Sequence, residues 1–313
     1  MSRRALNREG YPTHLTGMSF MQDTDRRAVK MGLGAVMLWS TVATAFSLSL
    51  QYLTPLQLVT LATVVSWCFF AIRLSTPERW SAMRVTSSKA RATGLLVGWL
   101  NPGLCYLVLF AAYDRLPAQE AMAINYSWGI TLALLAALLL RQRLSAGALL
   151  AACISYSGIL VIATRGAPLS LDFAQPLGVG LALLSTVLWS LYWVINTRLS
   201  LDPEVNLFLN FSGALPLLLA LLCWSSTPFP TLWQGWAGGL YVGLFEMGLA
   251  FVLWMGAMKA TTSTLRISSL IFLSPPLSLV LIWVITGEPV KAYTLVGLVL
   301  ILFGLYLQRR AES

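Results

Sequence analysis

The chain has 313 residues, of which 57% are hydrophobic and 11% are charged, and its mean hydropathy is +0.73. A soluble domain usually has about a quarter of its residues charged, so this composition excludes an ordinary soluble protein. The formal net charge of +9 comes from basic residues clustered between apolar blocks, where membrane topology signals lie, and it does not indicate nucleic acid binding.

The first 30 residues are polar and basic, and they lack the apolar core of a secretory signal peptide. We expect residues 1–30 to form a cytoplasmic N-terminal tail that is mobile over residues 1–25. The single histidine, His14, lies in this tail and is expected to be solvated.

Ten apolar blocks follow, each long enough to cross the roughly 30 Å of hydrocarbon in a bilayer. Charged residues, Pro or Gly flank them, as at Thr54-Pro55 and Asp202-Pro203. The alternation of a membrane β-barrel is absent, so only helices can satisfy the backbone of these blocks. We therefore predict an all-α integral membrane protein with ten transmembrane helices, at residues 31–51, 55–74, 92–113, 120–140, 146–163, 178–198, 204–224, 236–258, 264–286 and 291–307.

Lys and Arg are distributed unevenly between the two sides of these spans. Eighteen lie on the side of the N-terminal tail, whereas Arg115, Arg165 and Lys291 lie on the other. Cytoplasmic loops carry the excess of basic residues, so we predict a multi-pass protein of the inner (plasma) membrane with both termini cytoplasmic. The longest polar connection, residues 73–91, is expected to be cytoplasmic and partly helical along the membrane surface.

The sequence also repeats itself weakly. Leu38-Trp39-Ser40 recurs as Leu188-Trp189-Ser190, and Gly158 matches Gly304 at an offset of 146 residues. Five spans per half mean that the second half enters from the opposite side, so we predict two inverted repeats with a central cavity between them. The predicted parts are the tail, a first repeat at 31–163, an extracytoplasmic linker at 164–177, a second repeat at 178–307 and a cytoplasmic C-terminal tail at 308–313.

Groups that support catalysis or cofactor binding are scarce. The predicted spans contain no histidine, no Ser/His/Asp set, no paired carboxylates and no P-loop. The four cysteines lie in separate apolar blocks without a CxxC pair, so we expect small buried hydrophobic side chains rather than disulfides or metal ligands. We predict no catalytic residues, no cofactor and no metal.

The fourth predicted span carries the segment Asn125-Tyr126-Ser127-Trp128-Gly129. Asn125 and Trp128 share one helical face, and a polar amide there should look into the bundle or a wet cavity. The matching region of the ninth span contains Ser274-Pro275-Pro276, which breaks the helical ladder. Interruptions at corresponding places in two halves indicate a binding site, although Asn125 could equally serve as an interhelical contact and Trp128 as packing.

A second polar and aromatic face lies in the sixth predicted span, where Trp189, Tyr192, Trp193 and Asn196 recur at helical spacing. Rings with polar tips suit an amphipathic organic substrate, and packing alone is the alternative. Further candidates for substrate binding, each of which could also be structural, are Asn101, Trp39 with Ser40, and Trp254.

Glu246 is the one carboxylate well inside a predicted span. Because an isolated buried charge is costly, Glu246 should be protonated, paired or in contact with water. We regard it as a proton-coupling candidate. The alternative is a hydrogen-bonding role beside the small-residue ladder of Gly235, Gly239 and Gly243.

Taken together, these residues resemble the EamA-type branch of the drug/metabolite transporter superfamily over the whole chain. Asn125-Tyr126-Ser127-Trp128-Gly129, Ala118-Gln119-Glu120-Ala121, and Trp189 with Tyr192 resemble segments of the YddG-like aromatic amino acid exporters, with Ser127 and Gly129 where those exporters have Leu and Pro. The resemblance implies that Tyr126, Trp128 and Trp189 line the substrate cavity.

The predicted function is a secondary transporter that exports neutral, aromatic or other hydrophobic amino acids by alternating access. An exporter of other small metabolites or drugs is the alternative, and a membrane-embedded enzyme acting on lipid is a remote one. We expect a monomer whose partners are a small-molecule substrate and membrane lipid, not nucleic acid.

Overall fold

The computed structural model describes residues 13–139, 146–169, 173, 175–196, 198–199, 201–226, 228, 231–261, 267 and 270–312. Within these ranges all regular secondary structure is helical, and no residue is in a β-strand. The described elements of the first half are α1 (Thr13–Ser49), α2 (Pro55–Leu74), α3 (Pro77–Val85), α4 (Ser88–Gly98), the π-helical η1 (Trp99–Leu104), α5 (Cys105–Tyr113), α6 (Ala118–Asn125), α7 (Trp128–Leu139) and α8 (Ala146–Ala163). Those of the second half are α9 (Pro176–Asn196), α10 (Pro203–Trp224), α11 (Trp233–Tyr241), the π-helical η2 (Val242–Leu249), α12 (Ala250–Ala260), the 3₁₀ turn η3 (Leu270–Leu273), α14 (Ser274–Thr286) and α15 (Ala292–Glu312).

Seven stretches of the described residues are long and apolar enough to cross a membrane. They are Asp25–Ser49, Pro55–Leu74, Ser88–Tyr113, Ala118–Leu139, Pro176–Asn196, Pro203–Trp224 and Trp233–Ala260. The other predicted spans contain shorter apolar helices, at Leu149–Ala163, Leu270–Thr286 and Ala292–Gln308. The structure thus confirms an all-helical protein with several apolar spans, whereas the ten-span count remains a prediction.

Helix ends follow the punctuation in the sequence. Thr54 and Gln57 form a reciprocal capping box at the start of α2, and Pro55 occupies its first turn. Asp202 accepts hydrogen bonds from the backbone N–H groups at the start of α10. At the end of α14, Gly287 has a φ of 71°, a left-handed conformation that glycine adopts without steric cost.

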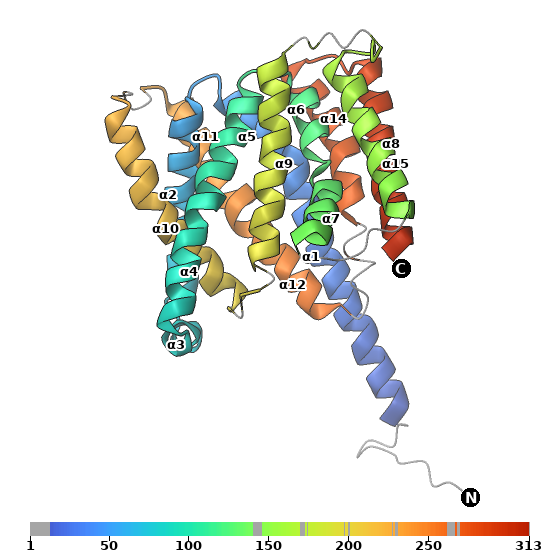
Figure 1. Ribbon diagram of the computed structural model, residues 1–313. Helices are drawn as coiled ribbons and strands as arrows, with labels where there is room; N and C mark the ends of the chain where they lie inside the picture. Colours follow the sequence, from blue (N-terminus) through green and yellow to red (C-terminus); the bar gives the residue numbers. More distant parts are fainter. Residues whose placement is uncertain are drawn as a thin grey trace, which may run out of the picture.

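The polar connection at 73–91 contains the short exposed helix α3, as expected. At the N-terminus, α1 begins at Thr13 and projects beyond the bundle (Figure 1), so the predicted tail is helical over its described part. Cys105 is buried, but Cys68, Cys153 and Cys223 are exposed, which corrects the expectation that all four are buried. A thiol is apolar enough for the outer face of a membrane bundle.

Long apolar helices contact one another through small residues. Gly98 lies against the Asn210 carbonyl and Gly213 against the Leu95 carbonyl, so α4 and α10 approach backbone to backbone. In the same way, Gly239 and Gly243 lie against α2. This close approach explains the glycine ladder noted in the sequence, because small residues drive helix association where lipid offers no hydrophobic driving force.

The helices that matter for the interior come from both ends of the chain. Helix α1 packs on α12 and α14, and α9 packs on α5, α6 and α7 near the centre of the bundle (Figure 1). Helices α8 and α15 lie side by side along their length. The middle of the bundle is therefore surrounded by α1, α5, α6, α7, α9, η2, α12, α14 and α15.

The glycine contacts can be tested by adding one methyl group. In Gly213→Ala the new Cβ would overlap the Leu95 carbonyl oxygen, so α4 and α10 must move apart. Overpacking of this kind costs about 1–3 kcal/mol. We expect the melting temperature in detergent to fall by several degrees. Gly180→Ala is the matched control because no atom lies within 4 Å of its added Cβ. Equal melting temperatures for the two variants would contradict this packing.

Candidate functional site

A cavity of about 450 Å³ occupies the middle of the bundle. It reaches from Phe46 and Tyr113, near the ends of α1 and α5, to Met258 and Gln308, near the ends of α12 and α15. Most of its lining is apolar or aromatic, with a few polar side chains, which is typical of small-molecule sites. The polar side chains of the lining are Tyr106, Tyr113, Asn125, Tyr126, Glu246, Ser278 and Gln308, together with the tryptophan indoles.

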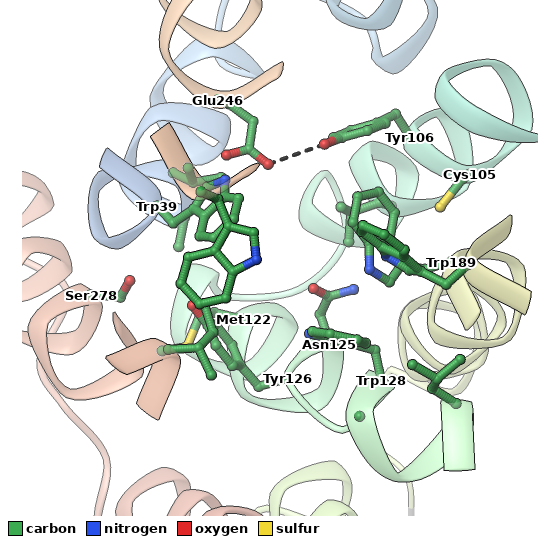
Figure 2. A pocket seen from close by; sticks show the side chains of 18 of the residues that line it. Trp39, Cys105, Tyr106, Met122, Asn125, Tyr126, Trp128, Trp189, Glu246 and Ser278 are labelled. Carbon is green, nitrogen blue, oxygen red and sulfur yellow. Dashed lines mark hydrogen bonds between the residues drawn. The ribbon is translucent and has the colours of Figure 1, made fainter. Parts of the chain in front are cut away.

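Seven of the nine predicted site residues lie together on this cavity, and Figure 2 shows six of them from close by. The seven are Trp39, Asn125, Tyr126, Trp128, Trp189, Glu246 and Trp254. They come from six helical elements in both halves of the chain, so residues that are far apart in the sequence line one cavity.

The span at Ala118–Leu139 is interrupted in the wall of the cavity. Helix α6 ends at Asn125 and α7 begins at Trp128, so the break falls just before Gly129. Tyr126, at the break, donates a hydrogen bond of 2.6 Å from its hydroxyl to Ser274 Oγ, the first residue of α14. Ser40 on α1 also donates to Ser274 Oγ, over 3.3 Å. The interruptions of the fourth and ninth predicted spans are thus in direct contact.

Helix α9 supports the break from the other side. Asn125 Nδ2 donates to Ser185 Oγ over 3.1 Å, and Ser190 Oγ donates to the Trp128 carbonyl over 3.2 Å. Both α9 serines are buried. Asn125 therefore makes the interhelical contact that was the alternative reading of the sequence, and it lines the cavity as well.

Aromatic rings form a continuous wall around the cavity. The Trp189 ring centroid lies 6.0 Å from that of Tyr106 and 6.2 Å from that of Phe251. Trp39 continues the wall, at 5.8 Å from Phe251 and 5.3 Å from Trp254. Because these rings pack edge-on or tilted against each other, the wall keeps its shape without a ligand.

Glu246 lies on the π-helical η2 and lines the cavity between Trp39 and Tyr106 (Figure 2). Its Oε1 accepts a hydrogen bond of 3.1 Å from the Tyr106 hydroxyl. Its Oε2 is covered and has no hydrogen-bond partner among the described residues. In the described part of the chain, no three His, Cys, Asp or Glu side chains are grouped as metal ligands would be.

Two predicted site residues do not reach the cavity. Tyr192 is buried between helices, and its hydroxyl lies 2.9 Å from the side-chain amide of Asn210 on α10. Asn101 is buried in η1, where its φ of −144° and ψ of 121° depart from helical geometry. Helical spacing placed Tyr192 beside Trp189 but could not show that α10 covers this side of α9. For Asn101, helical spacing gives no direction because its backbone is not helical.

Comparison with known proteins gives the family. The model of the EamA-like transporter family matches residues 26–164 and again residues 176–309. The chain belongs to the EamA-like transporter family. The resemblance seen in the sequence is thereby confirmed, and the protein is a membrane transporter of EamA type.

Relatives of this EamA-like protein include named transporters from bacteria. The chain is 24% identical to the uncharacterized transporter YxxF of Bacillus subtilis over 78% of its own length and 76% of the relative's. It is 25% identical to the aromatic amino acid exporter YddG of Ancylobacter novellus over 83% of its length and 88% of that protein's. A solved protein crystal structure matches with a TM-score of 0.60, covers 91% of this chain and 99% of its own, is 24% identical and supports the fold.

Polar contacts lie at the start of α6 in this EamA-like bundle. Gln119 Nε2 donates to Glu288 Oε1 over 2.6 Å, and Gln119 Oε1 accepts from the Lys291 backbone N–H over 2.9 Å. Next to them, buried Glu120 accepts a hydrogen bond of 2.9 Å from Tyr293 and lies 3.4 Å from Arg165 Nε. These contacts join the start of α6 to the connection between α14 and α15.

Sequence patterns missed several cavity residues. Tyr106, Phe251 and Ser278 lie in apolar helices without a polar cluster of their own, and only their positions in the bundle bring them to the cavity. Ser274, which contacts Tyr126, had one signal in the sequence, because it precedes the two prolines that interrupt the ninth predicted span.

The contact between the two breaks can be tested with a double-mutant cycle. Tyr126→Phe and Ser274→Ala each remove the 2.6 Å hydrogen bond between their hydroxyls. We expect each to lower the free energy of unfolding by about 0.5–1.5 kcal/mol. The double variant should lose clearly less than the sum, as residues in contact do. Strict additivity would show that the two breaks are not coupled.

Proposed function

We propose that this protein is a secondary transporter that exports neutral, aromatic or other hydrophobic amino acids by alternating access. The observation that carries the proposal is the central cavity, whose ring wall offers apolar contact while Asn125 and Tyr126 offer polar atoms to the other end of a substrate. The relative named as an aromatic amino acid exporter supports this substrate class.

We further propose that ten spans form two inverted repeats of five. The family model matches the chain twice, once in each half. A π-helical segment lies within Ser88–Tyr113 and another within Trp233–Ala260, and the breaks beside Tyr126 and Ser274 also occur at corresponding places. Transporters built in this way carry their site at the midplane, between the halves.

Alternating access requires one end of the cavity to be shut while the other is open. The polar contacts of Gln119 and Glu120 close the end near Phe46 and Tyr113. At the other end, the cavity lining reaches Met258 and Gln308. By the excess of basic residues, this second end faces the cytoplasm, so the arrangement would receive substrate from inside the cell.

The cavity assignment predicts a selective loss of transport. Trp128→Ala and Trp189→Ala should reach the membrane normally but lower kcat/KM for an aromatic amino acid about fivefold or more. A stacked ring is worth about 1 kcal/mol beyond its lost area. Trp224→Ala is the control because Trp224 is 86% exposed at the end of α10. Transport in proteoliposomes measures the effect, and parental rates in both cavity variants would refute the assignment.

The orientation can be tested separately. Reporter domains fused after Ser313 or before Met1 should be active only when the reporter works in the cytoplasm, because eighteen basic residues lie on that side. A reporter at either end that is active outside the cell would contradict the ten-span arrangement with both termini inside.

We assign proton coupling to Glu246. Glu246 is the one carboxylate among the described residues that line the cavity, so a proton and the substrate can compete for the same group. Tyr106 contacts it, and Cys105, Tyr113 and Tyr126 are the other titratable side chains of the lining. Glu246→Gln should flatten the dependence of transport on pH. A variant that keeps the parental pH profile would mean that Glu246 is structural.

A further inference from the structure

The surroundings of Glu246 also indicate which charge a bound substrate has. Its carboxylate lines the cavity between Trp39 and Tyr106 (Figure 2). One oxygen accepts a hydrogen bond from the Tyr106 hydroxyl, and the other is covered and has no hydrogen-bond partner among the described residues. An ionised carboxylate in such a place is costly unless a positive group lies beside it. The carboxylate is therefore incomplete as an anion site and suited to receive a cation.

The rings around Glu246 favour the same kind of ligand. Trp39 contacts Phe251 and Trp254, and Tyr106 contacts Trp189, so ring faces and edges line the cavity on both sides of the carboxylate. The face of an aromatic ring attracts a cation, and the attraction grows when water is excluded. A carboxylate within an aromatic wall is the usual chemistry for holding an ammonium group.

Positive charge is missing from the lining. No Lys, Arg or His is among the described residues that line the cavity, and Glu246 is the one carboxylate there. A substrate carboxylate would meet only neutral donors such as Asn125. The site therefore offers a strong partner to the amino end of an amino acid and a weak one to its acid end.

We propose that the cavity recognises its substrate through a protonated amino group bound at Glu246, and that it binds monocationic aromatic amines or amino acid amides more tightly than the parent zwitterions. This rests on the proposed transport function and adds the charge preference of the site. The ammonium pairs with the Glu246 carboxylate where it lines the cavity and lies against the rings of Trp39 and Trp254. The hydrophobic part of the substrate extends toward Trp189 and Trp128.

The test uses one ring with different charges. Binding to the full-length protein in detergent is measured for phenethylamine, phenylalaninamide, phenylalanine, 3-phenylpropionate and 2-phenylethanol, and transport of labelled phenylalanine is measured in proteoliposomes. We expect the two cations to bind about tenfold or more tightly than the alcohol and more tightly than phenylalanine, and the anion to bind weakest. Amines that bind no better than the alcohol would overturn the proposal.

Variants assign the preference to the carboxylate. Glu246→Gln should lower amine affinity about tenfold or more while changing the affinity for 2-phenylethanol less than about twofold. Glu78→Gln, in the exposed helix α3, is the matched control and should change neither. If Glu246→Gln does not fold, the order of affinities of the five compounds for the parent protein still tests the charge preference.

Two failures are distinguishable. If phenylalanine is transported but the Glu246→Gln variant keeps the parental ranking of ligands, the charge preference is wrong and the transport function stands. If the parent neither binds nor transports any of the five compounds, both proposals are wrong.

Discussion

Every backbone N–H and C=O group within a membrane must find its partner inside the protein, and the rest of this structure depends on that constraint. The interruption of a helix in this bundle is covered by other helices. The break between α6 and α7 lies against α9 and α14, where Tyr126 meets Ser274 and Ser190 meets the Trp128 carbonyl. The cavity therefore lies beside an interruption that the surrounding helices make possible, because they supply partners for its backbone groups.

The same constraint explains the composition of the cavity wall. The Trp128 carbonyl at the break and polar side chains such as Asn125 and Ser278 form hydrogen bonds to neighbouring helices. Aromatic rings then fill the remaining wall, supplying contact area without needing many partners. A wall of this kind fits a substrate with a hydrophobic body and a small polar end. Glu246 is the exception, because one of its oxygens is covered and has no hydrogen-bond partner among the described residues.

Many helix boundaries could be predicted from the sequence, because Pro, Gly and capping residues mark helix ends locally. Thr54-Pro55 and Asp202-Pro203 begin helices where expected, and Gly287 ends one. Trp189, a cavity residue within the regular helix α9, was also found from its spacing. The clustering of the cavity residues follows from the membrane, which leaves a polar or amphipathic side chain few places except the interior.

The positions of other residues relative to the cavity could not be predicted, because they depend on packing between segments that are far apart in the chain. Tyr192 shares a helix with Trp189, but Asn210 on α10 holds it away from the cavity, and no local pattern shows which neighbour covers that flank. Asn101 lies in a π-helical segment, so helical spacing does not give its direction. Tyr106 reaches Glu246 from a helix 140 residues away in the chain, which no periodicity could indicate.

The most direct test of the central claim, that the cavity carries amino acids across the membrane, is an uptake screen. The purified protein is reconstituted in proteoliposomes and offered labelled amino acids of different side chains, together with hydrophobic dyes. The account predicts saturable uptake of aromatic and large aliphatic amino acids, and little uptake of acidic ones. Uptake of dyes or other metabolites with no uptake of hydrophobic amino acids would contradict it.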